Sequence, residues 1–233
     1  MILQRLATSF RKQDWFTVVV ETLIVVFGVF IGLQMNNWNE RLNAASREAN
    51  LISQLHAAFV VELENVKDGH AYTVSLRDAT SHVLEVLDGD EPPADTEAFA
   101  EELLFALQSI GPVFEVPIVS VIMSTGDLAE LSSPTLRNAL TDYHFQIDGV
   151  RTLSVNQMRM LADLSNGAQR GLRIVIDDET GLYRIAEYDF EALKSARELY
   201  QAQLTTQIHL LEYIGDVERT TETIVEELER QRR

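Results

Sequence analysis

The sequence predicts an all-α protein with one N-terminal transmembrane helix, followed by an elongated antiparallel bundle of about four helices with a small β-hairpin insertion. Three observations lead to this prediction. Residues 16–33 are almost uniformly apolar, long stretches after them repeat apolar residues at helical spacing, and two short β-prone runs flank a glycine-containing turn near residue 180. We expect a cytoplasmic amphipathic segment (1–14), a transmembrane helix (15–35) and an extracytoplasmic helical-bundle domain (36–233).

The net charge and the basic N-terminal segment indicate how the chain is oriented. The chain carries −17 at pH 7, and residues 1–35 contribute +1 of this while the remainder contributes −18. A surface this acidic repels phosphates, which argues against nucleic-acid binding. Arg5, Arg11 and Lys12 precede the apolar run, and fewer basic residues closely follow it. This bias predicts a cytoplasmic N-terminus, with residues 1–14 lying as a short amphipathic helix on the inner leaflet.

The apolar run from Phe16 to Leu33 has the length of a membrane span, and Glu21 is its only charged residue. Trp15 and Trp38 flank the run, as aromatic residues do at membrane–water interfaces. One alternative is a core helix of a soluble protein, but such helices rarely stay apolar on every face. The other is a cleaved signal peptide, but its apolar region is usually shorter and ends in a small-residue cleavage pattern. We therefore interpret the run as a signal anchor.

Four residues of the span share one helical face and predict a helix–helix interface: Glu21, Val25, Gly28 and Gly32. The two glycines form a G-x-x-x-G motif, which lets helix backbones approach closely in lipid. An acidic side chain on the same face is shielded from lipid when that face contacts protein. The alternatives are an ordinary pair of membrane glycines and a glutamate that reaches the inner headgroups, because Glu21 lies about 9 Å of helix rise beyond Trp15.

Polar residues follow the span directly. Together with Trp15 and Trp38, we expect Gln34, Asn36 and Asn37 at the membrane interface, where their side chains can bond headgroups or neighbouring copies.

The anchor resembles a known family at the run GVFIGLQMNNWNE, from Gly28 to Glu40. This run is similar to the opening of an uncharacterised family of bacterial single-pass membrane proteins, a domain of unknown function. A looser resemblance to the same family lies between Phe114 and Tyr143. The resemblance implies a single-pass protein of the bacterial inner membrane with a periplasmic domain, and it implies no activity.

Beyond the span, the chain from Trp15 to Leu87 contains no proline, so we expect the anchor helix to continue to about Leu87. Its apolar stripe is interrupted between Gly69 and Thr80, which predicts a kink or break near Gly69. Further elements are predicted by caps, turns and periodicity. They are helices at about 96–109, at 134–166 behind Ser133 and at 190–230 behind Asp189, and a hairpin at 173–185.

The apolar stripe of the last helix predicts its core residues. They are Leu193, Leu199, Leu204, Ile208, Leu211, Ile214, Val217, Thr221, Ile224 and Leu228.

The sequence contains no familiar catalytic or metal-binding motif. It lacks a P-loop, a G-x-S-x-G elbow and an H-E-x-x-H pair, and it has no cysteine. His56 and His70 share a helical face, but about 21 Å of helix separates them, which is too far for one ion. We therefore predict no catalytic residue, no metal site and no cofactor.

Three functions remain open on the sequence alone. The first is a membrane-anchored, non-enzymatic interaction, scaffold or sensory module whose periplasmic bundle contacts a partner or ligand. The second is an accessory subunit of a membrane ion-driven complex in which Glu21 handles protons. The third is an enzyme whose site is assembled from residues far apart in the sequence. The expected partners are membrane lipid and either further copies of the chain or another membrane protein.

Overall fold

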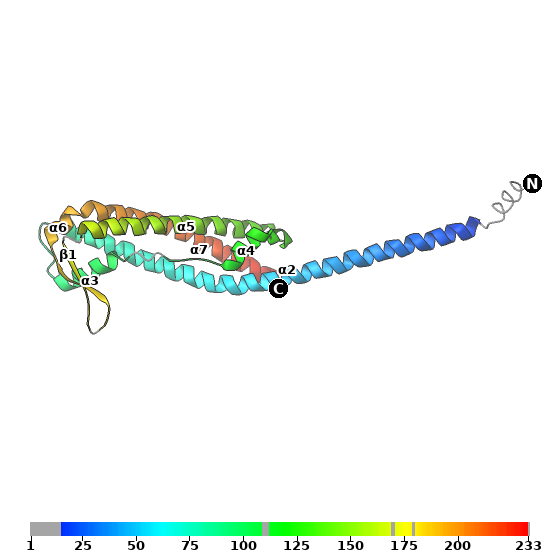
Figure 1. Cartoon of the computed structure of the whole chain (residues 1–233), viewed down its shortest axis with the longest axis horizontal. Coiled ribbons are helices and arrows are strands. Elements are labelled where there is room, and N and C mark those ends of the chain that lie inside the picture. The colour runs from blue at the N-terminus through cyan, green and yellow to red at the C-terminus, as the bar shows by residue number, and fades with distance from the viewer. Residues whose placement is uncertain (1–14, 109–111, 169–170, 179, 233) are drawn as a thin grey trace, which may run out of the picture. The chain divides into compact units, whose positions relative to one another are not determined.

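The computed structural model describes residues 15–108, 112–168, 171–178 and 180–232, so the predicted amphipathic segment 1–14 lies outside the described residues. By its internal contacts the chain divides into two units, residues 1–51 and residues 52–233. The elements, in order, are helices α2 (Trp15–Leu87), α3 (Thr96–Ala106) and α4 (Pro117–Thr125), the 3₁₀ helix η1 (Asp127–Glu130), helix α5 (Pro134–Ala168), strands β1 (Leu172–Ile176) and β2 (Tyr183–Tyr188), and helices α6 (Phe190–Ser195) and α7 (Arg197–Gln231). The predicted all-α class with a small hairpin is confirmed (Figure 1).

The described part of unit 1 is the first section of α2. Its large apolar side chains between Val19 and Leu42 are all exposed, and α2 contains the one stretch among the described helices with the length and hydropathy to cross a membrane. None of that stretch is buried inside the structure. A core helix of a soluble protein hides its apolar side chains, so the absence of burial favours a membrane segment over that alternative.

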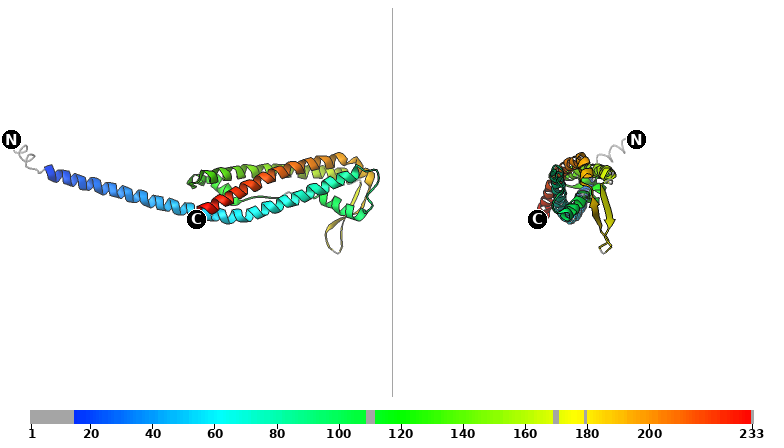
Figure 2. Two further views of the ribbon diagram at one scale, coloured as in Figure 1. Left: turned by 180° about the vertical axis from the view of Figure 1, so that it is seen from behind. Right: turned by 90° about the vertical axis from the view of Figure 1, so that its left-hand side faces the viewer.

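Unit 2 contains three long helical segments that lie side by side: α2 from Ile52 onward, α5 and α7 (Figures 1 and 2). Helix α7 runs antiparallel to α2, because Arg232 contacts His56 at one end and Arg197 contacts Asp88 at the other. It also runs antiparallel to α5, where Ser133 bonds Glu227 and Thr206 lies against Met160. Helix α5 and the part of α2 from Ile52 onward therefore run in the same direction.

The buried side chains of these helices recur at alternating spacings of three and four residues. This is the heptad repeat of helices that pack at a shallow angle with interlocking side chains. The buried positions that follow this repeat are Ile52, Leu55, Phe59, Glu62, Val66, Thr73, Leu76, Thr80, Val83 and Leu87 in α2; Leu136, Leu140, Tyr143, Ile147, Val150, Ser154 and Gln157 in α5; and Tyr200, Gln203, Gln207, Leu210, Ile214, Val217, Thr221, Ile224 and Leu228 in α7. Four neighbouring residues are buried outside the repeat: Ala79, Leu84, Ala139 and Glu227.

The predicted break near Gly69 is wrong, because α2 is helical throughout this region. A Cβ at Gly69 would lie 2.7 Å from Cβ of Pro112 and 2.8 Å from Cζ of Phe114. The glycine therefore permits a close approach of the chain after α3. The apolar stripe looked interrupted because Thr73 and Thr80 hold heptad positions there, and each hydroxyl donates to the carbonyl four residues earlier.

The predicted final helix is divided in two. Asp189 caps α6 as expected, since its carboxylate accepts from the amides of Glu191 and Ala192, but the α-helical pattern is interrupted at Ala196. Helix α7 then buries Gln203, Gln207 and Leu210, and Ile208 is 43% exposed. The prediction of Ile208 as a core residue is therefore wrong. The prediction treated α6 and α7 as one helix and counted only apolar residues, so it missed the two buried glutamines.

One buried charged group is part of the bundle interior. Glu62 is 4% exposed on α2, and its carboxylate accepts a 2.6 Å hydrogen bond from the hydroxyl of Tyr143 on α5. Burial and the neighbouring carboxylate raise the pKa of Tyr143, so the phenol stays protonated and remains a donor. The pair joins α2 to α5 in the interior of unit 2.

At the far end of unit 2 from Ile52, a second cluster fixes the position of the hairpin. Ile185 of β2 is buried with Phe99 and Leu103 of α3 and with Leu87, the last residue of α2. The rings of Phe99 and Tyr188 meet edge to face with their centroids 5.4 Å apart. Helix α3 and strand β2 are thus held against each other by a shared apolar core.

Candidate functional site

A concave, partly apolar groove of about 840 Å³ lies between α3 and β2 in unit 2. Such a surface, apolar with a few polar groups, is the default location of a binding site. The lining residues come from both elements and the loops around them. They are Pro92, Thr96, Glu97, Ala100, Glu101, Leu104, Phe105 and Gln108, then Asp177, Thr180, Leu182, Tyr183, Arg184, Ile185, Ala186, Glu187, Tyr188 and Phe190.

Local hydrogen bonds set the two walls in place. Asp95 caps α3, because its carboxylate accepts from the amide of Ala98 at 3.0 Å. The hairpin turn is closed by Asp177, which accepts from both the amide and the hydroxyl of Thr180. Gly181 has φ of +69°, a conformation that side chains rarely adopt. The turn residues therefore fix where β2 begins beside α3.

The groove follows the edge of β2 rather than one of its faces. All six residues of the strand, Tyr183 to Tyr188, line the groove, and no residue of β1 does. Successive side chains of a strand point to opposite faces, so a groove on one face would touch only alternate residues. The strand order is β1-β2, and among the described residues β2 has no strand partner on its other side. Its outer edge is therefore open to the groove.

The α3 wall is acidic. Glu97 and Glu101 lie one helical turn apart, line the groove and are exposed, and neither has an ion-pair partner among the described residues. The groove's arginine, Arg184, is already 3.4 Å from Asp177, and Glu187 pairs with Arg173 at 2.6 Å. The groove therefore carries a net negative charge, which comes from the two glutamates of α3.

Two tyrosines have raised pKa values at or beside the groove: Tyr188 lines it, and Tyr72 contacts Gln108, which lines it. Burial and the nearby charge of Asp95 raise the pKa of Tyr188, whose hydroxyl is buried without a hydrogen-bond partner in the described part of the chain. Burial also raises the pKa of Tyr72, whose hydroxyl donates to Gln108 at 3.2 Å. Both phenols are thus neutral at pH 7.

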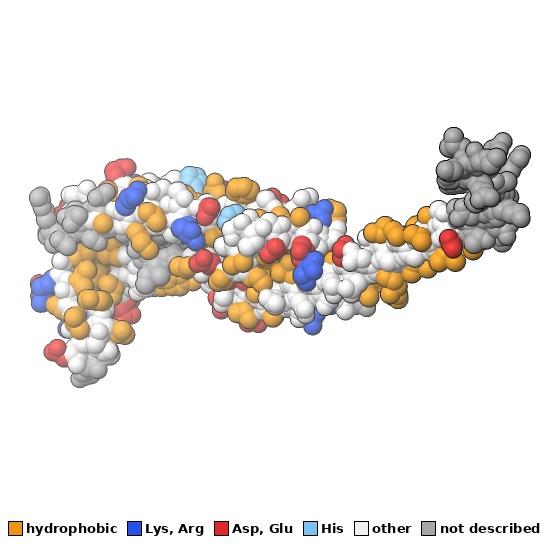
Figure 3. Space-filling model, turned by 45° about the vertical axis from the view of Figure 1, so that its right-hand side comes forward, with side chains coloured by type: hydrophobic (Ala, Val, Ile, Leu, Met, Phe, Trp, Pro, Cys, Tyr) orange, Lys and Arg blue, Asp and Glu red, His pale blue; other side chains and the backbone are white. Residues whose placement is uncertain are grey.

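The hairpin carries apolar side chains that are not packed against the bundle. Ile174, Ile176, Leu182 and Tyr183 are 46%, 59%, 68% and 67% exposed. Figure 3 shows hydrophobic side chains gathered on the projecting hairpin. Exposed apolar surface next to a groove is typical of an interaction site.

The four residues predicted as a helix–helix interface all lie in the exposed section of α2. Val25 is 64% exposed, Glu21 is exposed, and a Cβ added at Gly28 or Gly32 would meet nothing within 4 Å. The face is open along a single chain, and its role as an interface stays a prediction.

The predicted membrane-interface residues also lie on α2. Gln34, Asn36, Asn37 and Trp38 are exposed, and the amide of Asn36 donates to Glu40 at 2.7 Å. Trp15 is the first residue of the helix. These positions fit the predicted interfacial role but do not test it.

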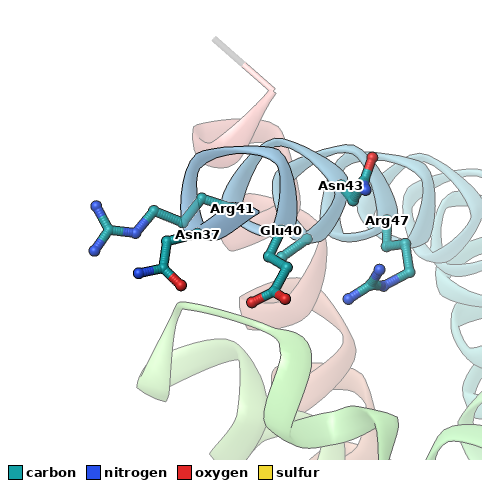
Figure 4. Close-up of a pocket in the computed structure, with 6 residues that line it drawn as sticks. Asn37, Glu40, Arg41, Asn43 and Arg47 are labelled. Atoms are coloured by element: carbon teal, nitrogen blue, oxygen red, sulfur yellow. The ribbon is translucent and has the colours of Figure 1, made fainter. Parts of the chain in front are cut away.

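A polar hollow follows these residues on α2. It is lined by Asn37, Glu40, Arg41, Asn43, Ala44 and Arg47. Figure 4 shows the side chains of Asn37, Glu40 and Arg47 directed to one side of the helix, with Asn43 pointing away. The guanidinium and amide groups suit phosphate or carbonyl oxygens, which are the groups found at a membrane surface.

Three histidines take part in separate contacts between elements. His70 lies 2.6 Å from Glu218, His82 lies 2.5 Å from Glu102, and His56 faces Arg232. Among the described residues no group of three or more metal-binding side chains comes together. The histidines therefore serve as contacts between helices in this structure.

Comparison of the chain with protein-family models, with curated proteins and with solved structures found no match.

Proposed function

We propose that the protein is a membrane-anchored, non-enzymatic interaction module that binds a partner protein through the groove between α3 and β2. The groove is the observation that supports this best. It combines a partly apolar wall with a strand edge and two carboxylates, Glu97 and Glu101, that have no pairing partner in the part of the chain that the structure describes. In this proposal, unit 2 is an elongated helical bundle that presents the groove outside the cytoplasm.

The apolar section of α2 supplies the anchor in this proposal. A span of eighteen residues holds a single-pass protein in the bacterial inner membrane, with the N-terminus in the cytoplasm and the domain in the periplasm. Arg41 and Arg47 follow the span on α2, where they can pair with headgroup phosphates. The anchor raises the local concentration of the groove near other membrane proteins, which strengthens weak binding without new contacts.

The exposed face of α2 supports a second candidate function. Glu21 shares its face with Gly28 and Gly32, and none of the three is covered by another described residue of the chain. A carboxyl group in lipid is costly unless it faces protein or carries a proton. An accessory subunit of an ion-driven complex would use this face, and copurification of a multi-pass protein that depends on Glu21 would favour it.

A groove-filling substitution tests the first proposal. Ala100→Trp places a large ring on the α3 wall, and Ala57→Trp places the same ring on an exposed position of α2 as a control. The tagged full-length variants are crosslinked in native membranes, and the captured proteins are quantified by mass spectrometry. We expect one partner to be lost from Ala100→Trp and retained in Ala57→Trp, with both variants folded by circular dichroism. Equal capture by both variants would refute the groove as the binding site.

A further inference from the structure

We propose that the groove binds an extended polypeptide segment that contains Lys or Arg and adds to the free edge of β2 as a third strand. This inference rests on the proposed function, and it specifies the conformation and the charge of the bound segment.

The extended conformation of the bound segment follows from the free edge of β2. In a two-stranded antiparallel sheet, about half of the backbone N–H and C=O groups of each strand point away from the partner strand. Those of β2 point towards the groove, because all six residues of the strand line it. An unpaired edge of this kind is a template for a further strand, and extended peptides bind many domains in this way.

The length of the bound segment follows from the strand. At about 3.3 Å per residue, the six residues of β2 extend about 20 Å, so a segment of about six residues matches the edge. Half of its side chains would face α3, where Leu104 and Phe105 provide apolar contacts. The side chains that face α3 therefore need apolar surface, which the aliphatic stems of Lys or Arg supply while their charged ends stay free to pair.

The expected charge of the bound segment follows from the two glutamates of α3. Glu97 and Glu101 are four residues apart, which is about 6 Å along the helix. Side chains on one face of a strand are about 6.6 Å apart, so basic residues at positions i and i+2 of the segment can each reach one glutamate. An anionic lipid surface would be repelled by the same two carboxylates. A second copy of the chain, which carries −17, is also disfavoured by charge.

The first test uses defined peptides and the full chain in detergent micelles. The probe is an acetylated, amidated octapeptide of alternating Lys and Val, labelled for fluorescence anisotropy. A second peptide carries N-methyl groups on alternate backbone amides, and a third has Glu in place of Lys. We expect the first to bind, the N-methylated peptide to bind at least about tenfold more weakly because several backbone hydrogen bonds are lost, and the Glu peptide not to bind.

The second test uses the acidic wall. Glu97→Gln combined with Glu101→Gln should weaken binding of the Lys-Val peptide about fivefold, because two partly exposed ion pairs are lost. The control is Glu64→Gln with Asp68→Asn, which removes two exposed acids at the same spacing on α2 and should leave binding unchanged. Hydrogen exchange of the β2 amides should slow when the peptide is bound.

Several results would overturn the inference. They are the absence of peptide binding at millimolar concentration, equal binding of the N-methylated peptide, and equal effects of the two double substitutions. Protection of the β2 amides that grows with protein concentration alone would show that a second copy occupies the edge. Each of these outcomes leaves the Ala100→Trp experiment unaffected, so failure of the strand-addition inference can be distinguished from failure of the proposed function.

Discussion

Replacing two buried glutamines by leucine should stabilise unit 2. Gln157 of α5 is 1% exposed and Gln207 of α7 is 0% exposed, and neither amide group has a hydrogen-bond partner among the described residues. A buried polar group without a partner costs about 1–3 kcal/mol, and leucine of similar volume also gains apolar burial. The shape of leucine differs from that of glutamine, and imperfect packing cancels part of this gain. We therefore expect each substitution to raise the free energy of unfolding by about 1–2 kcal/mol.

A third glutamine provides the control. Gln203 is equally buried and its side-chain oxygen also lacks a partner among the described residues, but its Nε2 donates to the carbonyl of Ala106 at 2.6 Å, at the end of α3. Gln203→Leu leaves that carbonyl without its partner, so we expect a loss of about 1–2 kcal/mol. The measurement is thermal unfolding of the full chain in detergent, followed by circular dichroism. For a domain of this size, 1 kcal/mol corresponds to about 2–4 °C in Tm.

The sign of the change is the decisive result. If Gln157→Leu and Gln207→Leu lower Tm as much as Gln203→Leu, the amide groups of these two glutamines are hydrogen-bonded in solution. That result would contradict the prediction that their burial is destabilising. A rise in Tm for the first two and a fall for the third would confirm that a buried glutamine destabilises unit 2 when its amide group is unpaired and stabilises it when the amide is hydrogen-bonded.

Three further predictions concern the anchor. Val26→Arg, near the centre of the span, should cost about 2.5–3.5 kcal/mol on insertion scales, and membrane fractionation should show release or failed insertion; a variant that fractionates like the parent would argue against a span. Gly28→Ile and Gly32→Ile should each reduce crosslinked oligomers in native membranes, while Ile24→Leu, off that face, should not; equal crosslinking would exclude this helix interface. A tag at the C-terminus should be digested by protease added to intact spheroplasts, and protection would reverse the orientation.

The sequence predicted the elements of this fold better than their inward faces. Ser133, Asp95 and Asp189 cap helices because the capping chemistry is local, and local chemistry is readable from neighbouring residues. The inward face of α7 was predicted correctly from Ile214 to Leu228 and wrongly at Ile208, because Gln203 and Gln207 hold the heptad positions beside it. A search for alternating spacings of three and four, with Gln and Thr allowed inside, would have found the correct face.

The groove was not predicted because it depends on contacts between distant parts of the chain. The sequence predicted α3 and the hairpin separately, and no local signal indicates that Phe99 packs against Tyr188. The unpaired edge of β2 was equally hidden, since strand order is a property of the whole fold. The spacing of Glu97 and Glu101 on one helix face was visible, but acidic pairs are common on the surface of a protein with this charge.

The most direct test of the central claim is site-specific photocrosslinking in intact cells. A photoreactive amino acid replaces Tyr183, which lines the groove, or Tyr213, an exposed tyrosine of α7 outside it. We predict a defined adduct with one partner protein at Tyr183, its loss when Ala100→Trp is added, and no such adduct at Tyr213. Adducts of the same protein at both positions, or an adduct at Tyr183 that persists with Ala100→Trp, would contradict the account.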